Sequence, residues 1–241
     1  MLIEQPPRLL RWLYPRAQWR MEPSERAVYL TFDDGPIPEA TPWVLDILDR
    51  YGVKATFFVV GDNVRKYPEI FREVVRRGHS IGNHTFHHIS GHIHGDFHFN
   101  EDVELCRREI EKHRPTPSPS LRGRGADTSS FGRYPADEVT SPRPLREGQE
   151  VGLFRPPHGW MKPNQYRYVA ARYRVVMWDL VTRDYSTRLS AADVVRNIKR
   201  YARNGSIITF HDSLKSIDKL RTALPESIEW LQAQGYEFKK L

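Results

Sequence analysis

Two pairs of side chains in this sequence could bind a metal ion together. His84 and His88 stand four residues apart, and Asp33 and Asp34 are adjacent. If residues 84–88 form one helical turn, the two imidazoles lie on the same side of it, with Cβ atoms about 6 Å apart. Two imidazoles and one carboxylate form a facial metal site that leaves positions open for water and substrate. We therefore predict a divalent-cation site formed by His84, His88 and either Asp34 or Asp33.

The two aspartates also have a simpler explanation. Residues 33–36 (DDGP) are typical of a turn, because Asp and Gly favour turn conformations. The metal site is favoured by other ionisable groups that follow short apolar segments elsewhere in the chain. These groups are Arg155, His158, Asp179, Asp184 and His211. Whether they can meet depends on the elements that carry them.

Segments that favour strands alternate with segments of helical periodicity. The predicted strands cover residues 27–32, 55–60, 79–83, 151–154, 174–178, 206–210 and 236–239. The predicted helices cover residues 39–51, 67–77, 100–113, 164–172, 190–202 and 216–234. This alternation predicts a parallel sheet with helices outside it.

Repeated strand–helix units within 241 residues predict a single-domain α/β fold. We expect a distorted (β/α) barrel of about seven parallel strands, with its chemistry at the carboxyl ends of the strands. The aspartates, imidazoles and arginine that follow the strands should then collect at one rim.

The predicted barrel leaves two segments outside its regular pattern. Residues 1–26 are expected to pack on the barrel as an N-terminal segment, and residues 27–241 form the catalytic domain. Within that domain, about residues 114–150 form a Pro-rich insertion that holds six of the 18 prolines. Long segments of this kind are typically functional or mobile loops.

Composition limits the classes of partner and compartment. The net charge of +7 is spread over the chain with no dense basic run, so we expect no nucleic acid partner. A single cysteine, Cys106, excludes an intrachain disulfide and a cysteine zinc cluster. No stretch approaches the ~20 apolar residues of a transmembrane helix. No export signal is visible at the N-terminus, which favours the cytoplasm; the sequence gives no oligomeric state.

Five segments in a fixed order resemble the polysaccharide deacetylase family, also known as carbohydrate esterase family four, with its chitooligosaccharide deacetylase homology domain. The segments are residues 31–35 (TFDDG), 84–88 (HTFHH), 155–159 (RPPHG), 178–185 (WDLVTRDY) and 208–212 (ITFHD). The resemblance extends from residue 27 to the C-terminus, apart from the insertion.

The resemblance implies a role for each residue. Asp34, His84 and His88 would bind a divalent metal, which we expect to be Zn²⁺, with Co²⁺, Ni²⁺ or Mn²⁺ as alternatives. Asp33 would be the general base, held by Arg155, and His211 the general acid. The backbone N–H of His158 would bind the oxyanion. Pro156, Trp178 and Tyr185 would contact the sugar.

Two motifs depart from the family pattern. His158 stands where the family usually has Tyr, which leaves the backbone donor intact but changes the sugar contacts. Val181 stands where the family often has Asp, and Tyr185 where it has Trp. That Asp orients the general acid in the family, so the partner of His211 stays open between Asp184 and Asp179.

The predicted function is metal-dependent removal of an N-acetyl group from an acetylated sugar or polysaccharide. The alternatives are an O-acetyl esterase or other amidohydrolase at the same metal, and a degenerate, non-catalytic glycan-binding protein. The sequence does not indicate which sugar, chain length or linkage is bound.

Several other polar residues have ordinary explanations. His92, His94 and His98 lie outside the motif positions, and we expect them on a solvated loop. His87 lies between the two metal-binding histidines, and we do not expect it to bind the metal. Asp212 is predicted to anchor the loop after its strand by accepting hydrogen bonds from backbone N–H groups.

Overall fold

The computed structural model describes residues 4–114 and 152–241. The predicted insertion therefore lies outside the described residues, apart from Arg114. Eight strands are present there: β1 (Ala27–Asp33), β2 (Thr56–Val59), β3 (Ser80–Asn83), β4 (Gly152–Phe154), β5 (Tyr173–Val175), β6 (Leu180–Val181), β7 (Ser206–His211) and β8 (Glu237–Phe238). All strand pairs are parallel, in the order β5-β4-β3-β2-β1-β7-β6, with β8 beside β1. Seven strands thus form a curled half-barrel, as predicted.

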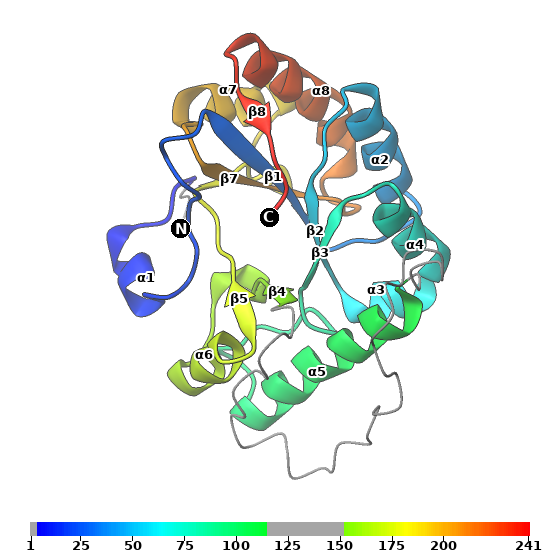
Figure 1. Cartoon of the computed structure of the whole chain (residues 1–241), viewed down its shortest axis with the longest axis vertical. Coiled ribbons are helices and arrows are strands. Elements are labelled where there is room, and N and C mark those ends of the chain that lie inside the picture. The colour runs from blue at the N-terminus through cyan, green and yellow to red at the C-terminus, as the bar shows by residue number, and fades with distance from the viewer. Residues whose placement is uncertain (1–3, 115–151) are drawn as a thin grey trace, which may run out of the picture.

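The helices surround the outer side of this sheet (Figure 1). They are α1 (Arg8–Leu13), α2 (Thr41–Arg50), α3 (Gly61–Lys66), α4 (Pro68–Arg76), α5 (Asp96–His113), α6 (Pro163–Ala170), α7 (Ala191–Tyr201) and α8 (Ile217–Ala233). Among the described residues, none of these helices is both long enough and apolar enough to cross a membrane.

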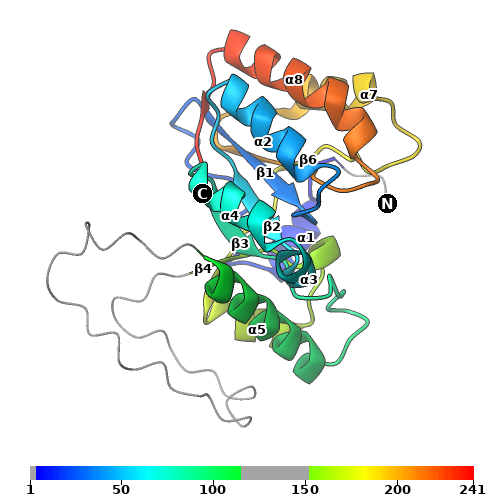
Figure 2. The same cartoon turned by 90° about the vertical axis from the view of Figure 1, so that its right-hand side faces the viewer.

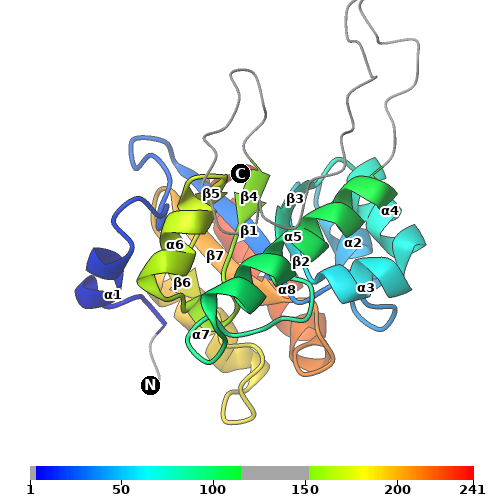
Figure 3. The same cartoon turned by 90° about the horizontal axis from the view of Figure 1, so that it is seen from below.

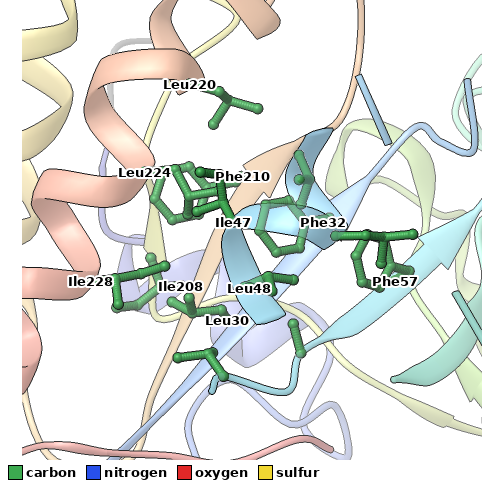
Figure 4. Packing of buried hydrophobic residues seen from close by; sticks show 14 of the residues in the cluster. Leu30, Phe32, Ile47, Leu48, Phe57, Ile208, Phe210, Leu220, Leu224 and Ile228 are labelled. Atoms are coloured by element: carbon green, nitrogen blue, oxygen red, sulfur yellow. The ribbon is translucent and has the colours of Figure 1, made fainter. Parts of the chain in front are cut away.

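The main core lies between the central strands and the helices α2, α3, α4, α7 and α8. β1 is buried along its whole length, as expected of a central strand covered on both faces. Phe32 stacks on Phe57 of β2 at 5.0 Å and on Phe210 of β7 at 5.8 Å between ring centroids. Figure 4 shows these rings with Ile47 and Leu48 of α2 and with Leu220, Leu224 and Ile228 of α8.

The predictions of individual elements were wrong in four places. The strand predicted at 174–178 ends at Val175, and α1, α3 and β6 were not predicted. The strand ends early because the carbonyls of Val176 and Met177 accept hydrogen bonds from Arg155, at 3.2 and 2.7 Å. A buried guanidinium thus takes carbonyl groups that a longer strand would use.

The two edges of the half-barrel are both hydrogen-bonded to the N-terminal segment. Gln18 donates its N–H to the carbonyl of Val175, and its carbonyl accepts from Met177, each at 2.8 Å. At the other edge, the carbonyl of Glu4 accepts from the N–H of Val181 in β6, also at 2.8 Å. Helix α1 lies between these two points in the chain, beside the opening and away from α2 to α5 (Figure 1).

Helix α5 lies against α3, as Figures 2 and 3 show from two sides. The backbones approach closely because Gly61 has no side chain: a Cβ there would lie 2.9 Å from the Cα of Cys106. This packing places Asp102, one turn earlier on α5, against the loop that follows β3.

Candidate metal centre and its surroundings

The carboxyl ends of four strands bring the chemically active side chains together. Asp33 is the last residue of β1, and His211 is the last residue of β7, its neighbour and register partner. His84 directly follows β3, and Arg155 directly follows β4. Parallel strands end at the same edge, so residues far apart in the sequence share one site.

Asp34, His84 and His88 have the geometry of a metal site. The Oδ1 atom of Asp34 lies 3.2 Å from Nε2 of His88 and 3.8 Å from Nε2 of His84. One ligand atom from each residue lies within 4.8 Å of the others, which no other group of three or more His, Cys, Asp or Glu side chains achieves among the described residues. The aspartate that faces the imidazoles is thus Asp34 and not Asp33.

Residues 84–88 do not form the helical turn on which the spacing argument depends. These residues form an irregular loop with positive φ angles at Thr85 (64°) and His88 (55°). The two imidazole centroids still lie 5.0 Å apart. The loop is fixed by side chains: Asn83 Oδ1 accepts from the Thr85 N–H at 2.8 Å, and Thr85 Oγ1 accepts from the Ile89 N–H at 3.2 Å. A backbone of this kind persists only where its surroundings over-determine it.

Asp102 holds the middle of this loop and was missed at the sequence level. It is buried, and its Oδ2 accepts from the backbone N–H groups of Phe86 at 2.8 Å and His87 at 2.9 Å. Its Oδ1 lies 2.6 Å from Nδ1 of His87, which draws that imidazole to Asp102. A buried aspartate 18 residues after His84 gives no sequence signal, because only the packing of α5 on α3 brings it here.

His84 is suited to bind a cation in its neutral form. Its Nδ1 lies 2.7 Å from the carbonyl of Arg155, so Nδ1 carries the proton and Nε2 presents its lone pair towards Asp34. Burial lowers the pKa of His84 to about 4, against the opposing effect of the Asp33 charge. The ring is therefore neutral at ordinary pH. The donor set of two imidazoles and one carboxylate fits a divalent cation of the zinc type.

Arg155 holds Asp33 in place. The guanidinium is buried and donates from one nitrogen to Oδ1 of Asp33 and to Oγ1 of Thr31, both at 2.7 Å. It also lies 4.1 Å from the ring centroid of Phe58. Burial lowers the pKa of Arg155, and the Asp33 charge opposes that shift. The two groups form a buried ion pair beside the triad.

Asp184 is the partner of His211. Its Oδ1 lies 2.8 Å from the imidazole Nδ1, and its Oδ2 accepts from the His211 backbone N–H at 2.8 Å. Burial lowers the pKa of His211, but the charge and hydrogen bond of the fully buried Asp184 raise it to about 9. Asp179 lies elsewhere and accepts hydrogen bonds from Arg203 Nε and Ser206 Oγ, each at 2.9 Å. The open choice between Asp184 and Asp179 is thereby decided.

The expected substrate contacts fall into two groups. His158, at φ 58°, and Tyr185 line the site: their rings lie 4.9 Å from His88 and 4.8 Å from His211. Pro156 is buried among its neighbours. Trp178 supports the backbone at Gly159, where an added Cβ would clash with its ring.

Asp212 behaves as predicted. Its Oδ1 accepts from the backbone N–H of Gly35 at 3.1 Å, and its Oδ2 accepts from Oγ1 of Thr41 at 2.6 Å. Burial raises the pKa of Asp212 to about 8. This side chain ties the loop after β7 to the turn that carries Asp34.

Comparison with known proteins places this geometry in context. Residues 20–130 match the family model described as Polysaccharide deacetylase. The chain is 28% identical over 223 residues to a peptidoglycan-N-acetylglucosamine deacetylase of Bacillus cereus, covering 91% of this chain and 88% of that protein. It is 30% identical over 228 residues to a chitooligosaccharide deacetylase of Bradyrhizobium sp., covering 90% and 89%. A crystal structure of a peptidoglycan N-acetylglucosamine deacetylase superimposes with a TM-score of 0.74 and 25% identity, over 96% of this chain and 94% of that one.

Proposed function

The chain belongs to the polysaccharide deacetylase family, and we propose that it hydrolyses the N-acetyl group of a sugar built on N-acetylglucosamine, as the names of its relatives indicate. The proposal rests on one observation: two ion pairs lie beside the triad of Asp34, His84 and His88. One pair joins an aspartate to an arginine, and the other joins an aspartate to a histidine. Asp33 is paired with Arg155, and His211 is paired with Asp184. A carbohydrate-binding protein without catalysis needs neither pair.

Asp34, His84 and His88 would hold the divalent cation, which we propose to be Zn²⁺, with Co²⁺, Ni²⁺ or Mn²⁺ as alternatives. When bound, the cation supplies a Lewis acid that polarises the acetamide carbonyl and acidifies water. The hydrogen bond from His84 to the Arg155 carbonyl would keep its ring in the ligating orientation.

Asp33 is assigned as the general base. Arg155 donates a hydrogen bond to its Oδ1 and fixes the carboxylate, so that the other oxygen can accept the proton of the attacking water. The two adjacent aspartates therefore have different roles: Asp34 is a ligand of the cation, and Asp33 accepts the proton of the attacking water.

His211 is assigned as the general acid. With a pKa of about 9, it is protonated at neutral pH. Asp184 accepts from Nδ1, which leaves the Nε2 proton for transfer to the leaving amine. The arrangement resembles other sites in which a buried carboxylate fixes the tautomer of a catalytic imidazole.

The remaining residues are assigned to binding. The backbone N–H of His158, in its tight turn after β4, would donate to the oxyanion. Tyr185 presents an exposed ring beside His211, and Trp160, which sequence reasoning missed, is also exposed close to His158 in the chain. Such rings would stack on sugar faces. Pro156 and Trp178 would support the backbone that forms the site.

Two predictions from the sequence remain predictions. One is the boundary at residue 26 between the N-terminal segment and the catalytic domain, and the other is the cytoplasmic location.

The proposal is tested by measuring acetate release from matched N-acetylated and O-acetylated saccharides. The purified protein is assayed as isolated, after chelation, and after each of the four metals is restored. We expect release from N-acetyl substrates that is lost on chelation and recovered with a divalent cation. Release from the O-acetyl substrates alone would replace the proposed activity with esterase activity. Binding of saccharides without acetate release from either would indicate the non-catalytic alternative.

A further inference from the structure

The segment that carries Asp184 has an unusual backbone and a buried charge. Arg183 has a φ of 60°, and only 7% of its surface is exposed. It directly precedes Asp184, so any change in its conformation moves the carboxylate that orients His211. A buried guanidinium also needs a counter-charge, because an unpaired buried charge is strongly unfavourable.

That counter-charge comes from the N-terminal segment. Oε1 of Glu4 lies 2.7 Å from a guanidinium nitrogen of Arg183, and the two side chains are 22% and 8% exposed. The backbone of the same residue contributes as well, since the Glu4 carbonyl accepts from the N–H of Val181. Glu4 therefore contacts the segment before Asp184 twice, through its backbone at Val181 and through its side chain at Arg183.

Two further contacts complete the support of this segment. Nζ of Lys219, on α8, donates to the backbone carbonyl of Asp184 at 2.7 Å, and the Ser186 N–H donates to the Arg183 carbonyl at 2.9 Å. Lys219 fixes the segment from the side of α8, and Glu4 fixes it from the open edge of the half-barrel. The side chain of Asp184 itself binds His211 and the N–H of Tyr185.

We propose that Glu4 is a positioning residue of the active site: by pairing with Arg183, it holds Asp184 in the geometry that orients the general acid His211. The inference rests on the proposed function, and it extends the active site to a residue before the first strand of the barrel. It also gives the N-terminal segment a part in catalysis beyond covering the open edge of the sheet.

The test compares Glu4→Gln, Arg183→Gln and the double variant, with Glu25→Gln as the matched control. Glu25 forms a surface ion pair with Lys239 at 2.6 Å, so the control removes an equivalent charge from the same end of the chain. Three quantities are measured for each metal-loaded protein: kcat and KM for acetate release from a soluble N-acetylated chitooligosaccharide, the melting temperature, and the hydrogen–deuterium exchange rate of the His211 amide. This amide donates to Asp184 and reports its position without any need for turnover.

We expect Glu4→Gln to lower kcat about tenfold with little change in KM, because small misplacements of a catalytic group are costly. The His211 amide should exchange faster in this variant, and Glu25→Gln should change neither quantity. Adding Arg183→Gln should cause little further loss, as expected of residues that act as a pair.

Unchanged exchange and kcat in Glu4→Gln would overturn the proposal, as would fully additive effects in the double variant. A lowered melting temperature with normal kcat and normal His211 exchange would reduce Glu4 to a structural residue and would also overturn it. If the wild-type protein releases no acetate, the proposed function fails, and the exchange rates alone decide whether Glu4 positions Asp184.

Discussion

Asp33 and Asp34 are neighbours in the sequence, yet their surroundings give them different chemistry. Asp33 ends β1 and faces the buried guanidinium of Arg155. At Asp34 the backbone turns to a φ of 84°, and this side chain faces the two imidazoles. The change in backbone direction between them separates the proposed proton acceptor from the proposed metal ligand.

This difference leads to the first prediction. Asp33→Asn removes the proposed proton acceptor and leaves all three proposed ligands in place, so turnover should fall by about 10²–10⁴-fold while a divalent cation still binds. Acetate release and metal content of the purified variant are measured together. Near-native turnover in the Asp33→Asn protein would show that the base is assigned to the wrong residue.

The pKa of His211 supports a second prediction. Burial lowers this pKa and Asp184 raises it to about 9, above the 6.5 of a free imidazole. The stabilisation from the charged pair is therefore complete below about pH 6.5 and is lost as the pH rises through about 9. Asp184→Asn should shift the alkaline limb of the kcat/KM profile to lower pH, since the acid form of His211 then persists over a narrower range.

The control for this prediction is Asp218→Asn, which changes an exposed carboxylate at the start of α8. Its pH profile should match that of the wild-type protein. If both variants keep the wild-type alkaline limb, then Asp184 does not set the protonation of the group that limits the rate.

At the scale of elements, the loop between β3 and α5 carries two proposed ligands on a strained backbone. Asn83 and Thr85 fix its ends, and Asp102 fixes its middle from α5. The loop depends on a helix that contributes no ligand of its own. The contact between α3 and α5 at Gly61 is thus part of what shapes the metal site.

Asp102→Asn should therefore weaken metal binding. An Asn side chain has a single acceptor oxygen, so it cannot accept both from the N–H groups of Phe86 and His87 and from Nδ1 of His87 as the two carboxylate oxygens do. The loop therefore loses part of its support. We expect a loss of about 10–100-fold in affinity for Zn²⁺, the size typical of changes around ligating residues. Competition with a chromophoric chelator measures it. Glu101→Gln, at the neighbouring exposed position of α5, should bind as the wild type does, and equal affinities in all three proteins would contradict the role of Asp102.

At the scale of the whole molecule, a core on one side of the half-barrel supports the strand ends that form the site. Phe32 lies one residue before Asp33 and packs between rings from β2 and β7. The same strand thus contributes to the core and to the site. The N-terminal segment covers the open side, through backbone hydrogen bonds to both edges and through Tyr14 and Trp19, which belong to a second hydrophobic cluster.

Phe32→Ala should be strongly destabilising. The ring is fully buried, and its removal should cost about 3–5 kcal/mol of unfolding free energy. Urea denaturation of the metal-free protein measures this change. Ile93→Ala, at a side chain that is 70% exposed, should stay within about 0.5 kcal/mol of the wild type. Similar losses in both variants would mean that the central rings do not form the main core.

The sequence by itself determined the parallel α/β architecture and the family. Buried parallel strands appear in the sequence as short apolar segments, so residue types alone placed Asp33, His84, Arg155 and His211 at the ends of strands. The roles expected of them came from the resemblance to the family. These signals are local: each depends on residue types within a few positions of the chain.

Only the tertiary structure decided the pairings. It selected Asp34 as the aspartate facing the imidazoles and Asp184 as the partner of His211, and it showed that the two imidazoles meet on an irregular loop. It also revealed Asp102 and Glu4, whose types and positions give no signal in the sequence. The reason is physical: a hydrogen bond between Glu4 and Arg183 joins residues 179 positions apart, and its existence depends on how every intervening strand and helix packs.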